Sequence, residues 1–254
     1  MSIKGFERIL KEKLLASFAL HADETALRVN KQLFWLHVKS TKDATLFFAH
    51  PRRSYQAMVE MGVLPNFKGI LVHDPYAPYF KFDCRHALCH IHHLRELEGV
   101  IETTNLKWAK EMKELFQEMN KSEDRQLQQK EFEEKYEAIL ERGFKEYEGT
   151  GPPMQWSQSR AKNLFNRLKN FKTKTLRFLG DKNIPFDNNL AERDIRMMKL
   201  KMKVSSCFRS SYFAKIFCLL RSFISTARKR GFKILKAIEL AFIGNPLVIF
   251  LQNS

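Results

Sequence analysis

Residues 18–50 read FALHADETALRVNKQLFWLHVKSTKDATLFFAH, and this stretch gives the strongest indication of the fold class. The segments RVNKQLFWLHVKS (28–40) and DATLFFAH (43–50) are rich in aromatic and β-branched residues, with a turn-prone Lys-Asp pair between them. They predict two antiparallel strands. The short apolar run FALHA predicts a third strand, which ends at Asp23.

The flanking sequence extends this pattern. An amphipathic helix is predicted before it, and after it a helix, PRRSYQAMVEMG, that Pro51 opens and Gly62 stops. GILVHD predicts a fourth strand that ends at Asp74, and the spacing over 83–100 is helical. Three strands, a helix, a fourth strand and then helices favour a three-layer α/β domain with a mixed sheet.

The second half of the chain predicts helices throughout. Residues 105–148 carry two helical stripes with almost no breakers, which indicates a helical hairpin inserted into the domain. A basic helix over 159–179 follows, and further helices begin near Asn189, near Ser211 and after Gly231. We therefore divide the chain into the first part of the domain, a helical insertion, and a C-terminal part with basic helices, at 1–104, 105–180 and 181–254.

Charge is concentrated in one region. The 254 residues carry a net charge of +16, and residues 160–236 alone hold 21 Lys and Arg against 4 Asp and Glu. The remainder of the chain is therefore close to neutral. So local an excess indicates a polyanionic partner such as nucleic acid, although a general solubilising excess is the alternative.

Other classes of protein are excluded or disfavoured. Four cysteines in apolar surroundings do not form a secreted disulfide framework. No apolar run reaches the ~18–20 residues of a membrane span. Lys11, Glu12 and Lys13 interrupt the apolar N-terminal stretch, so it is not a signal peptide. We expect a cytoplasmic protein without a membrane partner.

Two aspartates each come at the end of a predicted strand, Asp23 and Asp74. Carboxylates from neighbouring strands repel one another unless a cation lies between them, so such a pair is typical of a Mg²⁺ site. Glu192, on a later helix, can supply a third oxygen. Sites with two metal ions ~3.5–4 Å apart serve phosphodiester chemistry.

Each acid also has an ordinary structural interpretation. Asp23 followed by Glu-Thr and Asp74 followed by Pro75 both suit turns. Glu192 lies three residues after Asn189, as in a helix capping box. The residues by themselves leave these alternatives open.

The stretch IPFDNNLAERDIRMMKLKMKVSSCFRS (184–210), continued by LLRSFISTARKRG (219–231), closely resembles the end of the catalytic domain of transposases of the insertion sequence 66 family. Three further motifs occur in the family's order: HADET (21–25), LVHDPYAPY (71–79) and CHIHHLREL (89–97). The resemblance extends from about Leu15 to about Pro246. One departure is Pro75, where the family usually has Gly after the second acid.

The resemblance implies a bacterial DDE transposase with a ribonuclease-H-like fold and a helical insertion before the last acid. Asp23, Asp74 and Glu192 are then the catalytic acids and the ligands of two Mg²⁺ (or Mn²⁺) ions. The implied reaction is cleavage of the DNA strand at the element's ends, followed by transfer of the strand to target DNA. The resemblance also allows for a homo-oligomer, accessory transposition proteins and association with the nucleoid.

Cations directly follow the third acid, and Arg196 lies one helical turn beyond Glu192. Such a face can hold a DNA phosphate beside metal ions, although Arg196 can equally pair with Glu192. Asparagines here either bind DNA or cap the helix. We predict DNA contacts at Asn188, Asn189, Arg193, Arg196, Lys199 and Arg209. Trp156 suits a core position better than stacking on a flipped base.

The densest group of Cys and His residues extends from Cys84 to His93. Cys89 and His92 share a helical face, as some zinc ligands do, but no second pair follows at usable spacing. The family has a Cys-x-x-His-x-x-Arg pattern at this place, which Cys89, His92 and Arg95 match. We favour packing or DNA positioning over metal binding for this group.

Members of the family are typically about twice as long, with an N-terminal region that binds the element's ends. We therefore expect this chain to be a shortened copy, one reading frame of a split gene, or a remnant. An inactive DNA-binding remnant is the main alternative function. A general nuclease of the same fold is a third.

Overall fold

The hairpin at the start of the chain forms as expected, with longer strands. In the computed structural model, β1 (Ala19–Val29) pairs antiparallel with β2 (Gln32–Ser40), and β2 with β3 (Thr45–His50). The expected end of the first strand at Asp23 is wrong, because the pairing with β2 continues through Leu27 to Val29. The turn between β1 and β2 falls at Asn30 and Lys31, whose φ angles of 47° and 65° suit a tight hairpin turn.

The sheet has the strand order β3-β2-β1-β4-β5. β4 (Ile70–His73) runs parallel to β1, so the sheet is mixed, as predicted. The prediction of helix from residue 83 is wrong at its start, because residues Arg85–Leu88 form strand β5. An extended backbone over those four residues comes before the helix that the periodicity indicated.

The structure describes residues 3–148 and 160–251, so Trp156 lies outside the described residues. They form two compact units, one comprising residues up to Arg85 and from Asn188 onward, the other His86–Asp187. We describe each unit by itself. The division of the chain at 104 and 180 stays a prediction.

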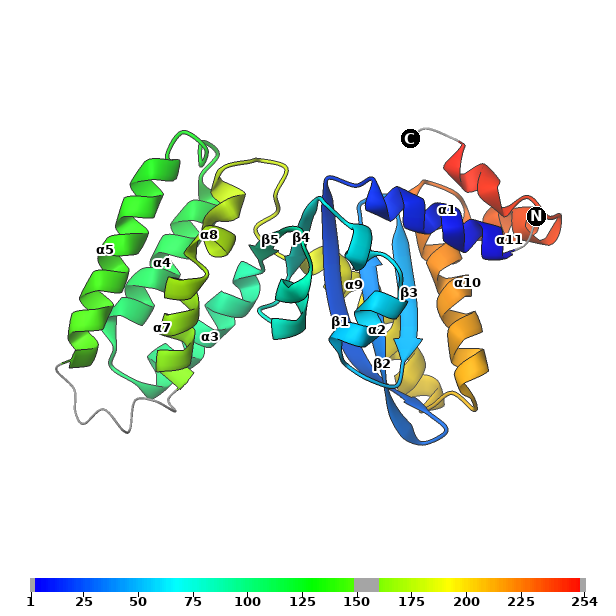
Figure 1. Ribbon diagram of the computed structural model, residues 1–254, viewed down its shortest axis with the longest axis horizontal. Coiled ribbons are helices and arrows are strands. Elements are labelled where there is room, and N and C mark those ends of the chain that lie inside the picture. The colour runs from blue at the N-terminus through cyan, green and yellow to red at the C-terminus, as the bar shows by residue number, and fades with distance from the viewer. Residues whose placement is uncertain (1–2, 149–159, 252–254) are drawn as a thin grey trace. The chain divides into compact units, whose positions relative to one another are not determined.

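In the first unit, the two faces of the sheet are covered by different helices (Figure 1). Leu20 and Ala22 belong to a core with α1 (Ile3–Leu15). Leu27 and Val29 point to the other face, where they pack with α9 (Asn189–Ser205) and the start of α10 (Ser211–Lys229). This alternation is the two-residue period of a strand buried on both faces.

Shorter elements complete this unit. They are α2 (Tyr55–Glu60), η1 (Leu64–Asn66), η2 (Ala77–Lys81), α11 (Ile234–Phe242) and η4 (Pro246–Phe250). The helix predicted from Pro51 begins four residues later, because Ser54 is its N-cap and its hydroxyl accepts the N–H of Ala57 at 3.2 Å. Gly62, with φ of 76°, ends the segment as predicted.

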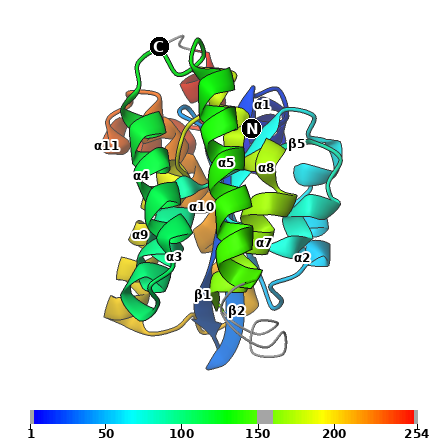
Figure 2. The same ribbon diagram turned by 90° about the vertical axis from the view of Figure 1, so that its left-hand side faces the viewer.

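The second unit is helical. Its elements are α3 (His90–Thr103), α4 (Lys107–Lys121), α5 (Gln129–Glu148), α7 (Arg160–Asn170), α8 (Lys172–Thr175) and η3 (Leu176–Leu179). The helices of the predicted hairpin are α4 and α5, which lie side by side in both views (Figures 1 and 2). Trp108, Phe116 and Tyr136 are fully buried between these helices and their neighbours. The single basic helix predicted over 159–179 is divided into α7, α8 and η3.

Candidate active site

Asp23 in β1 lies level with Asp74, which directly follows the neighbouring strand β4. β1 and β4 are parallel with His21 opposite Val72, so two residues further along the same register Asp23 lies beside Asp74. The residues of β1 with odd sequence numbers, Asp23 among them, point to the face of the sheet where α9 packs. The backbone N–H of Glu24 donates to Oδ1 of Asp23 at 2.7 Å. The sequence predicted that these two aspartates lie close together because each follows the end of a strand. In the structure Asp23 lies within β1, and the register between β1 and β4 places it beside Asp74.

Glu192 lies in the first turn of α9, and α9 is held against β1 on both sides of this residue. Ala191 and Ile195 pack into the core beneath the helix. Asn188, directly before the helix, donates from Nδ2 to the carbonyl of Ala22 at 2.8 Å. Its Oδ1 lies 3.0 Å from Nδ1 of His21. The start of α9, and Glu192 with it, is therefore fastened to the stretch of β1 that carries Asp23.

Asn188 has a structural role in this arrangement. Its side chain is 1 % exposed and bonded to β1, and it does not cap α9 through a side-chain hydrogen bond. A contact of this side chain with DNA stays a prediction, and it would require both hydrogen bonds to break. Asn189 is half-buried.

The charges of the three acids act on one another. The pKa of Asp23 is raised from 3.8 to about 7, above all by burial, and in addition by the negative charges of Glu24, Asp74 and Glu192. The oxygens of Asp23, Asp74 and Glu192 do not all lie within 4.8 Å of one another. Carboxylates near one another repel when no counter-ion lies between them. A shared cation would relieve the repulsion, so this donor set fits a hard divalent ion.

A buried network of charges lies on the opposite face of β1, and the sequence interpretation missed it. The carboxylate of Glu24 is 0 % exposed and accepts from Nε of Arg53 at 2.9 Å and from the hydroxyl of Tyr79. Lys39, also fully buried, lies with its Nζ 5.2 Å from the centre of the Tyr79 ring. Burial lowers the pKa of Lys39 to about 8, although the negative charges of Glu24, Asp23 and Asp74 raise it.

Two signals in the sequence point to this network. Lys39 is a charged residue among the largely apolar and aromatic residues of its strand, and Glu24 alternates with Leu20 and Ala22. A charged residue in such a position is almost never fully buried unless it is paired. The pattern thus indicates a buried ion pair, although it does not name Arg53 as the partner.

The predicted DNA-contacting cations are accessible. Arg193, Arg196 and Lys199 are exposed on α9, and Arg209 is exposed beyond it. Within the described part of the chain, Arg196 forms no salt bridge, so the alternative of a simple pair with Glu192 finds no support there. These side chains are free to meet an anion.

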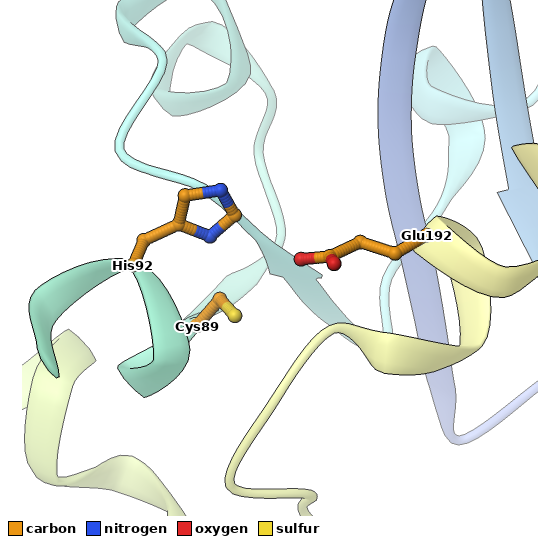
Figure 3. Close-up of side chains that lie close together, drawn as sticks. All are labelled: Cys89, His92 and Glu192. Atoms are coloured by element: carbon orange, nitrogen blue, oxygen red, sulfur yellow. The ribbon is translucent and has the colours of Figure 1, made fainter. Parts of the chain in front are cut away.

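The Cys and His group at the start of α3 is mainly part of the core of the second unit. His90 and His93 are buried among Phe116, Phe178 and Phe186, and Nδ1 of His90 lies 3.0 Å from the carbonyl of Phe186. These two histidines therefore pack, as one of the favoured interpretations has it. Figure 3 shows Cys89 directly before α3 and His92 in its first turn, together with Glu192 in the first turn of α9.

The mixed five-stranded sheet with its helices is consistent with a DDE nuclease-like fold. The family model for "Transposase IS66 family" matches residues 2–216, and the chain belongs to this family. Membership implies a role in transposition and dependence on a divalent metal ion. A search of curated proteins gave no match. Of the helices described, none has the length and apolar character needed to span a membrane.

Proposed function

We propose that this chain is the catalytic part of a transposase, with a ribonuclease-H-like core that cleaves DNA strands at the ends of an insertion sequence and joins them to target DNA. The observation that supports the proposal is that Asp23 on β1 feels the negative charges of Asp74, directly after β4, and of Glu192 on α9, all within one unit. Asp23, Asp74 and Glu192 are the family's acids by motif, and the pKa of Asp23 responds to the other two. The helical segment before Glu192 is then the family's insertion.

Asp23, Asp74 and Glu192 would hold the metal, as two Mg²⁺ or Mn²⁺ ions. Bound there, such ions supply the means to activate a water or hydroxyl and to neutralise charge on the leaving oxygen. The chain itself needs no protein nucleophile. The polypeptide would place three oxygen ligands on regular secondary structure. A carboxyl with a pKa of about 7, as Asp23 has, can exchange its proton for a metal cation at neutral pH.

Arg193, Arg196 and Lys199 would bind DNA phosphates next to the acids. They are exposed on the helix that carries Glu192, so DNA held by them lies beside that residue. Arg209 extends the same basic surface, and Asn189 adds a polar contact. Because these contacts are to phosphates, they give affinity without sequence preference.

The proposal is tested with DNA that carries the sequences flanking this gene, including any inverted repeats, incubated with the protein and Mg²⁺. We expect wild type to nick or join this DNA and Asp74→Asn to lose at least two orders of magnitude in rate, because a metal ligand is removed. Asp83→Asn is the matched control, since the Asp83 side chain is 96 % exposed and pairs with Lys68.

Equal activity of wild type and Asp74→Asn would show that these acids are not the catalytic ones. Binding without cleavage by wild type, with all three acids intact, would favour the inactive DNA-binding remnant. Cleavage of unrelated DNA at the same rate would favour a general nuclease.

A further inference from the structure

Arg53 lies at the edge of the acid cluster and is held there from beneath. Its Nε and Nη2 lie 2.9 Å and 2.8 Å from the same Oε1 of Glu24. Because the Glu24 carboxylate is fully buried and also accepts from Tyr79, it is a fixed anchor. The edge of the guanidinium formed by Nε and Nη2 is therefore bound to the buried carboxylate of Glu24.

Aromatic rings fix the plane of the guanidinium. The centre of the Tyr76 ring lies 4.0 Å from Cζ of Arg53, and the Trp35 ring lies 5.2 Å away. The Tyr76 hydroxyl donates to the backbone carbonyl of Arg53 at 2.8 Å, which ties ring and arginine together. The flat guanidinium can stack on such rings with its whole plane, which the compact ammonium of a lysine cannot do.

The outer edge of Arg53 faces the proposed metal site. Its Nη2 lies 3.8 Å from Oδ2 of Asp74, a distance too long for a hydrogen bond. One third of the Arg53 side chain is exposed, and Asp74 is 23 % exposed. Within the described residues, Nη1 donates no hydrogen bond. A fixed cation with spare donors thus stands at the accessible side of the acids.

Such a cation is what a phosphate needs at this place. Without metal ions, the carboxylates of Asp23 and Asp74 would repel an approaching DNA backbone. A preorganised arginine edge binds phosphate through two parallel N–H donors. The buried side of the guanidinium incurs no further ordering cost, because Glu24 already holds it.

We propose that Arg53 binds a phosphate of the DNA strand on the Asp74 side of the active site. The proposal rests on the proposed function, because it takes DNA as the substrate and the acids as the metal site. It adds a substrate contact from the loop between β3 and α2, separate from the cations of α9.

The test measures binding of a fluorescein-labelled duplex of random sequence over a series of salt concentrations, with Ca²⁺ in place of Mg²⁺ to prevent cleavage. For Arg53→Gln we expect the slope of log K against log salt to fall by about 0.9, as when one phosphate is no longer neutralised. For Arg53→Lys we expect an unchanged salt slope, because the positive charge is kept. We expect the affinity for the duplex to be several-fold weaker, because lysine lacks the two parallel N–H donors. Arg52→Gln is the control, because Arg52 is the exposed neighbour in sequence and should leave the slope unchanged.

Mn²⁺ binding, measured by calorimetry without DNA, distinguishes a phosphate contact of Arg53 from a role in which Arg53 only positions the metal-binding acids. We expect Arg53→Gln to keep Mn²⁺ binding. A variant that loses Mn²⁺ binding while its salt slope stays at the wild-type value would overturn the phosphate contact. If Arg53→Gln does not fold, folded Arg53→Lys with wild-type DNA affinity would also overturn it.

The same calorimetry identifies a failure of the proposed function. If Asp74→Asn binds Mn²⁺ as wild type does, the metal site is wrong, whatever the salt slope of Arg53→Gln. If Asp74→Asn loses Mn²⁺ and Arg53→Gln keeps the full salt slope, only the Arg53 proposal fails.

Discussion

At the scale of single residues, the candidate active site is a set of charged side chains that act on one another. Asp23 is half-buried on one face of β1, and Glu24 is fully buried on the other, so the strand carries an acidic side chain on each face. Arg53 and Lys39 offset the charge of Glu24. Among the residues that the structure describes, Asp23 forms no salt bridge, and Lys39 is a cation whose pKa its charge raises.

Asp23 should destabilise the metal-free protein at alkaline pH. Its pKa is about 7 in the folded chain, above the ordinary 3.8, so the folded state loses stability as pH rises from about 4 through 7. The shift corresponds to at most roughly 4 kcal/mol, at ~1.4 kcal/mol per pKa unit. We expect Asp23→Asn to raise the free energy of unfolding by one to a few kcal/mol at pH 8, measured by urea denaturation in chelator.

Two controls make that prediction specific. Mg²⁺ should stabilise wild type at pH 8 and have little effect on Asp23→Asn, because only a carboxylate gains from the cation. Asp83→Asn, at an exposed site, should match wild type. A lower stability of Asp23→Asn at pH 8 in chelator would contradict the raised pKa.

The buried histidines of the second unit predict the opposite dependence on pH. Burial lowers the pKa of His90 to about 4 and that of His93 well below 6.5. Their contribution to the stability of the folded protein is therefore complete above pH 6.5. It is lost as pH falls from 6.5 toward 4, because the unfolded chain takes up protons that the folded chain does not.

We expect His93→Phe to reduce this loss of unfolding free energy by up to ~1.4 kcal/mol per pH unit, which is the effect of one proton taken up by the unfolded chain. Phe suits the site, since the ring of His93 already stacks on Phe116 with centres 5.9 Å apart. Urea denaturation at pH 7 and pH 5 measures the effect, with His50→Gln as the control in the first unit. Equal loss of stability in wild type and His93→Phe would refute the assignment.

At the scale of elements, α9 is the piece whose position matters most, because it brings Glu192 to the strand acids. Asn188 fastens its start to β1. One turn further, Asp194 accepts from Thr45 at 2.8 Å, from Lys229 at 2.7 Å and from Ser40. A single carboxylate thus joins α9, α10 and the β2–β3 hairpin.

Asp194→Ala should destabilise the protein by about 3–5 kcal/mol, since Lys229 would be left as an unpaired, largely buried charge. The double variant Asp194→Leu, Lys229→Met should recover much of this loss, because neither charge then needs a partner. Thermal unfolding measures both. If the double variant is as unstable as Asp194→Ala, packing and not charge pairing governs the site.

At the scale of the whole molecule, the positive charge and two of the three proposed metal ligands occur in different parts of the sequence. The excess lies in residues 160–236, while Asp23 and Asp74 come from the nearly neutral remainder. Folding of the first unit brings α9 onto β1, and with it the cations that follow Glu192. DNA affinity should therefore depend on where a cation lies and not only on how many there are.

We expect the pair Arg196→Gln, Lys199→Gln to lower the salt slope of DNA binding by about 1.8, at ~0.9 for each phosphate that the variant no longer neutralises. The control pair Lys130→Gln, Lys110→Gln removes the same charge from exposed positions on α5 and α4 of the second unit. That pair should leave the slope nearly unchanged. Equal effects of the two pairs would show that binding follows net charge alone.

Local patterning along the chain was enough to predict the hairpin, the fourth strand and the helical second half, whereas the three catalytic acids stay a prediction that rests on the family's motifs. Strand alternation, helical periodicity and the NNLAER motif are all readable in the order of the residues. The length of β1 escaped prediction because pairing with β2, not propensity, extends it through Asp23 to Val29. The split of the basic helix into α7, α8 and η3 carries no plain sequence signal.

The surroundings of the acids, in contrast, follow from tertiary packing alone. The parallel register of β1 and β4 sets Asp23 level with Asp74, and no local pattern encodes a register between strands about fifty residues apart. The same holds for Arg53, which reaches Glu24 from a loop, and for Asn188, which became an anchor of α9. Long-range packing assigns such partners, because it chooses which buried charges and amides meet once the layers close.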